Sequence, residues 1–139
     1  MSAVSFASVL LAGIASIIVE QLWYSPRVFG GAWLRLTNVS PEQVERGRKR
    51  GWSSTFVALL ASMLVALVMA YVGIALSINS FAGAAELGAL CWLGFCVPAL
   101  LNQVLWDQKP LALFLINAGY WLLSFIIIAF ILFYTAALQ

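Results

Sequence analysis

Four long runs of apolar residues occupy most of this 139-residue chain and constrain its fold more than any other feature. The runs cover approximately residues 3–24, 52–76, 87–106 and 111–138. A helix needs about 20 apolar residues to cross the hydrocarbon core of a bilayer. Only 9% of the residues are charged, against roughly a quarter in a soluble domain, so the chain could not cover itself with a polar surface. The runs therefore predict an all-α, polytopic membrane protein with four transmembrane helices in a single domain.

The connection between the first and second runs, residues 26–50, predicts a helical segment that lies along the membrane surface. Pro26 ends the first helix, because a proline ring clashes with a continuing helical backbone. The Gly30-Gly31 pair is expected to make the segment flexible. Ser40-Pro41-Glu42-Gln43 predicts a new helix start, with serine as the N-cap, proline at the first helical position and glutamine three residues after the cap.

Basic residues are concentrated in this connection. Six of the seven lie there, namely Arg27, Arg35, Arg46, Arg48, Lys49 and Arg50, and the seventh is Lys109 between the third and fourth runs. The positive-inside rule then places both of these connections in the cytoplasm and both termini outside. The cluster Arg46, Arg48, Lys49 and Arg50 predicts contact with anionic lipid headgroups, at about 1 kcal/mol per charge near the surface. Marking the topology is the alternative role for this cluster.

Aromatic residues agree with this orientation. Tyrosine and tryptophan gather at membrane–water interfaces. Five aromatic residues fall at the predicted cytoplasmic interface and are expected to be interfacial anchors: Trp23, Tyr24, Trp33, Trp52 and Trp106.

Small residues recur every four positions in two of the runs. The first stripe is Ser8, Ala12 and Ser16, with Glu20 closing the same face, and the second is Ser54, Ala58, Ser62, Ala66 and Ala70. Residues four apart share one face of a helix, and small residues there allow a neighbouring helix to approach closely in lipid.

Four polar side chains from three different runs fall in the same cytoplasmic third of the membrane, namely Glu20, Asn102, Gln103 and Asn117. Intramembrane polar groups pair with one another or face water, so we expect a cluster of Glu20 with Asn102 and Asn117, below a bend at Pro98. The cluster could be structural, at about 0.6–2 kcal/mol for each hydrogen bond. Alternatively it could bind a proton, a cation or a small polar solute, or Glu20 could extend to the interface instead.

The composition argues against an enzyme. Histidine is absent, and no carboxylate pair, metal-ligand pattern or phosphate-binding glycine loop is present. Cys91 and Cys96 are five apart, which matches neither a redox nor a zinc motif, so we expect small hydrophobic helix residues. We predict no catalytic residues, no metal and no cofactor, and a net charge of +2 is too small to indicate nucleic acid.

Three segments resemble a known protein family. They are Leu22-Trp-Tyr-Ser-Pro26 followed by Phe29-Gly30 and Trp33, then Trp92-Leu-Gly-Phe95, then Asn117-Ala-Gly-Tyr120. In this order they resemble domain of unknown function 1761, a set of small, mainly bacterial integral membrane proteins. The resemblance implies a four-helix protein of the bacterial cytoplasmic (inner) membrane, and it supplies no activity.

Two classes of function remain open. The small-residue stripes favour a packing or accessory subunit that forms a homo-oligomer or joins a larger membrane complex. An intramembrane acid and a bent helix favour a small channel or transporter, with a path through an oligomer or through the cluster of Glu20, Asn102 and Asn117. The outer halves of the runs are almost wholly apolar, so no continuous polar path is evident within one copy.

Overall fold

The computed structural model describes residues 4–137, and over that range it consists of helices joined by short turns. Four helical segments are long and apolar enough to cross a membrane: α1 (Phe6–Trp23), α4 (Gly51–Ala75), the segment Phe81–Leu105, and α7 (Leu111–Ala137). The predicted all-α fold with four membrane-spanning helices is therefore confirmed. The predicted start of the first span at residue 3 and end of the last at residue 138 lie outside the described residues.

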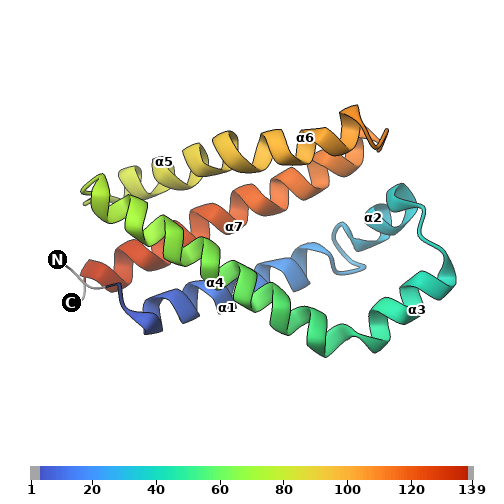
Figure 1. Ribbon diagram of the computed structural model, residues 1–139, viewed down its shortest axis with the longest axis horizontal. Coiled ribbons are helices and arrows are strands. Elements are labelled where there is room, and N and C mark those ends of the chain that lie inside the picture. The colour runs from blue at the N-terminus through green and yellow to red at the C-terminus, as the bar shows by residue number, and fades with distance from the viewer. Residues whose placement is uncertain (1–3, 138–139) are drawn as a thin grey trace.

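Helix α7 holds the bundle together. It packs against α1 on one side and against the third spanning segment on the other, while α4 packs mainly on α1. The two ends of the chain lie at one end of the bundle, and the connection between α1 and α4 lies at the other (Figure 1). We call these the N/C end and the α2–α3 end.

The third spanning segment changes its helical geometry halfway. It comprises α5 (Phe81–Cys91), a π-helical turn η1 (Trp92–Cys96) and α6 (Val97–Leu105). Pro98 lies in the first turn of α6 and lacks the N–H that an α-helical bond to Gly94 would need. A π turn accommodates one extra residue, so the residues after it are rotated by about 100° relative to a regular α-helix.

This third segment begins earlier than predicted. The expected turn over residues 77–86 shortens, because α4 ends at Ala75 and α5 already begins at Phe81. Ser77 adopts a left-handed conformation, with a φ of 53°, and the Ser80 side chain caps α5 by accepting a hydrogen bond from the Gly83 N–H at 3.0 Å. Gly83, which lies between the second and third predicted runs, is therefore inside the first turn of a helix.

The surface connection is helical, as predicted, and contains α2 (Gly30–Thr37) and α3 (Pro41–Lys49). The predicted capping box at the start of α3 is present. The Gln43 N–H donates to Ser40 Oγ at 3.2 Å, and the Ser40 N–H donates to Gln43 Oε1 at 2.8 Å. Every residue of α3 is exposed.

Gly30 serves a different purpose from the flexibility expected of it. It is buried at the start of α2, and a Cβ there would overlap the carbonyl oxygen of Tyr24. Its N–H donates to the Ser25 carbonyl at 3.0 Å. The glycine therefore allows the chain to fold tightly back after α1, and the expectation of a flexible hinge was wrong at this residue.

Small residues form the helix contacts of the core. The buried members of the two stripes are Ser8, Ala12 and Ser16 on α1 and Ser62, Ala66 and Ala70 on α4, whereas Ser54 is exposed and Ala58 half-buried. Two glycines outside the stripes make further close approaches. A Cβ at Gly13 would lie 2.7 Å from Met63 Cγ, and one at Gly88 would lie 3.0 Å from the Phe125 carbonyl oxygen.

A hydrogen bond between two buried serines closes the centre of the bundle. Ser16 Oγ on α1 and Ser124 Oγ on α7 are 2.5 Å apart, and both side chains have no exposed surface. Ala12 and Ile128 continue this layer toward the N/C end and are also fully buried. We call these four residues the waist.

The close approach at Gly30 generates a testable prediction. We expect Gly30→Ala to destabilise the protein by about 1–3 kcal/mol, because the added methyl meets backbone that cannot move aside without shifting α2. Gly31→Ala is the matched control, since the nearest atom to its added Cβ is the end of the Arg35 side chain at 3.7 Å. Thermal unfolding in detergent, followed by circular dichroism, measures both. Equal melting temperatures for the two variants would contradict this account of Gly30.

Candidate functional site

A cavity of about 660 Å³ opens at the α2–α3 end of the bundle. Its walls come from the end of α1 and from α2, α6 and α7. The lining residues are Glu20, Gln21, Tyr24, Pro26, Gly30, Gly31, Trp33, Leu34, Leu100, Gln103, Asn117, Tyr120 and Trp121. We call this the polar cavity, because its lining includes one carboxylate, three amides and two phenols.

Three of the four predicted polar residues meet here. Glu20, Gln103 and Asn117 all line the polar cavity although they come from three different helices. Asn117 is held in place by Tyr24, whose hydroxyl donates to Asn117 Oδ1 at 2.8 Å. This bond leaves the amide nitrogen of Asn117 free to donate.

Asn102 does not belong to this group, so its expected pairing with Glu20 is not found. Asn102 is exposed, whereas its neighbour Gln103 lines the polar cavity. The π turn explains the difference. In an unbroken α-helix, the buried face of α5 that includes Cys91 would continue to Asn102. The extra residue in η1 moves the inward-facing position by one residue, from 102 to 103. Cys96 is packed against the core accordingly.

The five predicted interfacial anchors separate into two groups. Trp52 and Trp106 are 93% and 79% exposed, which leaves them available to the membrane interface. Trp23, Tyr24 and Trp33 are each partly buried. The burial of these three comes from contacts with α7 and with one another, so they are structural parts of the site as well.

Trp23 and Trp92 both donate hydrogen bonds to backbone carbonyls in one turn of α7. The Trp23 indole N–H donates to the Ile116 carbonyl at 3.0 Å, and the Trp92 indole N–H donates to the Ala118 carbonyl at 2.8 Å. A Cβ at Gly119 would lie 2.9 Å from the Trp23 ring, so a glycine is needed where this ring packs. These contacts fix the position of Asn117, which lies between the two carbonyls in sequence.

Aromatic rings form one wall of the polar cavity. The ring centroid of Tyr24 is 5.5 Å from that of Tyr120 and 6.2 Å from that of Trp33, and Tyr120 is 5.1 Å from Trp121. Sequence reasoning missed Tyr120 and Trp121, which lie far from the predicted interface in sequence. Tyr120 and Trp121 lie three and four residues after Asn117. This spacing was the available signal, since such positions extend the face of α7 that carries Asn117.

Glu20 is the acidic residue of this cavity, and within residues 4–137 no basic side chain pairs with it. The lining includes no lysine or arginine. Within residues 4–137, no ion pair or hydrogen bond engages the Glu20 carboxylate. The basic residues of α3 are exposed, and none of them lines the cavity. The site therefore offers an uncompensated carboxylate beside aromatic faces and hydrogen-bonding amides.

Comparison with known proteins places the chain in a family but assigns no activity. No curated protein and no solved structure matches it. A family described as a protein of unknown function, DUF1761, matches residues 7–133. The resemblance to this family rests on the segments around Trp23, Trp92 and Asn117. The first and third of these segments line the polar cavity, and Trp92 donates to the α7 backbone next to Asn117. The chain belongs to the DUF1761 family.

Proposed function

We propose that this protein binds a small organic cation in the polar cavity and passes it across the membrane. The observation that carries the proposal is the uncompensated Glu20 carboxylate, which lies in a cavity without lysine or arginine. A half-buried carboxylate is costly in a membrane unless it is protonated or paired. An ammonium group within about 4 Å would gain roughly 4 kcal/mol of Coulomb energy at an effective dielectric constant near 20, before desolvation costs.

The aromatic wall favours an organic cation over a metal ion. A cation placed over a tyrosine or tryptophan face gains roughly 0.5–2 kcal/mol, and quaternary ammonium groups are recognised in this way. Tyr24, Trp33 and Tyr120 present such rings beside Glu20. The cavity volume of about 660 Å³ lies within the range of roughly 300–1,000 Å³ that is usual for small-molecule sites.

Passage requires a second conformation. The waist closes the bundle between the polar cavity and the N/C end, because Ser16 and Ser124 are hydrogen-bonded and fully buried. A serine pair is a suitable closure, since each hydroxyl can exchange its partner for water at little cost when the helices separate. Non-catalytic passage of this kind needs no cofactor.

An oligomer-forming or accessory subunit is the second candidate. Helix α4 supports it, because only 17% of its spanning window is buried within the chain, against 33% for α7. A second copy or another membrane protein could cover α4. No residue of α4 lines the polar cavity, so the two proposals are compatible and are tested separately.

For orientation, we propose the bacterial cytoplasmic (inner) membrane, with both termini outside and the α2–α3 end in the cytoplasm. The basic residues of α3 are exposed at that end, where they can contact anionic headgroups. The polar cavity would then open toward the cytoplasm.

Removal of the carboxylate tests the proposed function. We expect Glu20→Gln to weaken binding of radiolabelled tetraphenylphosphonium by at least about tenfold, a loss of roughly 1.4 kcal/mol, because the amide keeps the shape and removes the charge. Equilibrium binding to detergent-solubilised protein measures this. Glu86→Gln is the control, since Glu86 is exposed on α5 and does not line the cavity. Unchanged affinity in Glu20→Gln would refute cation binding at this site.

Adjacent residues in α6 provide a test of the geometry. We expect Gln103→Leu to reduce tetraphenylphosphonium affinity and Asn102→Leu to leave it unchanged, because only Gln103 lines the polar cavity. The same binding assay compares them, and the melting temperature shows whether each variant folds. The reverse order of effects would mean that the π turn does not set the inward face.

Single cysteines test the orientation. In a background with Cys91 and Cys96 replaced by alanine, we expect Asn79→Cys to react with a membrane-impermeant maleimide on intact cells. Arg48→Cys should react only after permeabilisation. Both positions are exposed and lie at opposite ends of α4. Labelling of Arg48→Cys on intact cells would reverse the proposed topology.

A further inference from the structure

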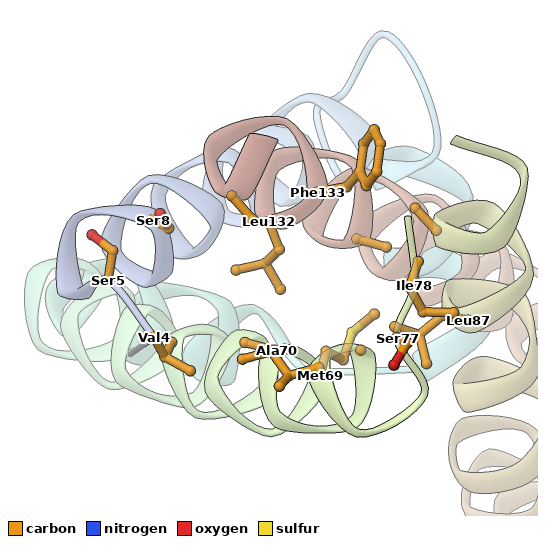
Figure 2. Close-up of a pocket in the computed structure, with 15 residues that line it drawn as sticks. Val4, Ser5, Ser8, Met69, Ala70, Ser77, Ile78, Leu87, Leu132 and Phe133 are labelled. Carbon is orange, nitrogen blue, oxygen red and sulfur yellow. The ribbon is translucent and has the colours of Figure 1, made fainter. Parts of the chain in front are cut away.

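A second cavity lies at the opposite end of the bundle and has a different chemistry. Its volume is about 530 Å³, and it is enclosed by the start of α1, the end of α4, the start of α5 and the end of α7. Figure 2 shows its lining side chains arranged around an open centre, with contributions from all four spanning segments. We call it the N/C cavity. The waist separates it from the polar cavity, and the two share no lining residue.

The polarity of the N/C cavity changes with depth. Its serines lie toward the mouth: Ser5 is the N-cap of α1, Ser8 is in the first turn, and Ser77 follows the end of α4. Its inner part is apolar and includes Met69, Leu87 and Ala129. Ala129 and Ala136 both line the cavity. They are seven positions apart on α7, so the cavity extends about 10 Å along the bundle.

Such a space is not suited to remain empty or to fill with water. Interiors are close-packed, and each void costs the contacts that its lining atoms lose. A water needs two to four polar partners, and the inner part of this cavity offers side chains such as Met69 and Leu87 instead. An apolar molecule is the occupant that satisfies these walls.

Ser8 adds a polar requirement near the mouth. Its side chain is only 7% exposed, and no hydrogen bond to it is formed within residues 4–137. No fully buried side-chain nitrogen or oxygen within residues 4–137 lacks a partner, so the Ser8 hydroxyl is open to the cavity that it lines. It can donate a hydrogen bond to an occupant with an acceptor near the mouth. A phospholipid in the adjacent leaflet has this arrangement, because its ester carbonyls accept hydrogen bonds near the interface and its acyl chains extend into the membrane.

We infer that the N/C cavity binds one acyl chain of a membrane phospholipid, with the ester carbonyl of that chain near Ser8 and Ser77. The chain enters from the leaflet at the N/C end and reaches Met69, and its headgroup stays at the interface. Phospholipids of the bilayer surround the four helices, so the proposed ligand is present at high local concentration. This inference does not depend on cation binding at Glu20, because the two cavities are separated by the waist.

Photocrosslinking in vesicles tests the inference. The full-length protein is reconstituted with a phosphatidylcholine that carries a diazirine halfway along one acyl chain, and adducts are located by peptide mass spectrometry. Met69 is 2% exposed and lines the cavity, whereas Leu64, on the same helix, is 62% exposed. Bulk lipid therefore labels Leu64, and only a chain inside the bundle labels Met69. We expect both adducts in the wild-type protein.

Filling the cavity provides the matched comparison. Gly73 lines the N/C cavity, and the nearest atom to an added Cβ is a Leu87 methyl at 3.4 Å. We expect Gly73→Leu to lower the Met69 adduct, relative to the Leu64 adduct, by at least fivefold. Gly94→Leu is the control, because Gly94 is exposed and has no neighbouring atom within 4 Å of an added Cβ. It should leave the ratio unchanged.

A second variant tests whether a lower ratio comes from filling the cavity or from misfolding of the first variant. Ala136→Trp blocks the same cavity from the end of α7 and should also lower the ratio. The absence of a Met69 adduct in the wild-type protein, with Leu64 labelled, would overturn the inference. A Met69:Leu64 ratio that neither Gly73→Leu nor Ala136→Trp changes would overturn it too. Tetraphenylphosphonium affinity measured on the same samples reports independently on the polar cavity.

Discussion

The close contact between α1 and α7 is the interaction on which this structure depends. The hydrophobic effect does not drive helices together within lipid, because lipid tails are as apolar as the side chains. Association therefore relies on close backbone packing and on hydrogen bonds between helices. Ala12 and Ser16 allow the proximity, and Ser124 completes the hydrogen bond. Because α4 packs mainly on α1 and the third segment packs mainly on α7, the contact between α1 and α7 is the principal link between the two sides of the bundle.

The two cavities follow from that arrangement. Buried small residues join α1 to α7 at the waist, and one cavity lies toward each end of the bundle. Helix α2 lines part of one cavity, and the turn after α4 borders the other. The two ends then differ by residue type. Glu20, Asn117 and four aromatic residues make the α2–α3 end suited to a cation, while Met69 and Leu87 make the N/C end suited to a chain of carbon atoms. One bundle thus presents two sites of opposite chemistry.

Much of the fold could be predicted from local patterns. The four spans follow from hydropathy, the α3 start from its capping box, and the buried faces of α1 and α4 from a repeat of four. The candidate site was predictable only in part. Glu20 and Asn117 could be found because charge and amide groups are rare in apolar runs. Asn102 was assigned wrongly, because periodicity fails where a π turn interrupts the helix. Tyr120 was missed although it lies three residues after Asn117 on the regular helix α7.

The sequence by itself determined the solvent, the number of spans and the place where charge could accumulate. These properties depend on composition along the chain, and a bilayer responds to composition directly. Only the tertiary structure decided that Gln103 rather than Asn102 enters the site, and that Gly30 provides space rather than flexibility. Trp23 and Trp92 likewise meet on α7 only once the chain has folded. Such outcomes depend on contacts between residues far apart in sequence, where one inserted residue or one close backbone approach redirects a side chain.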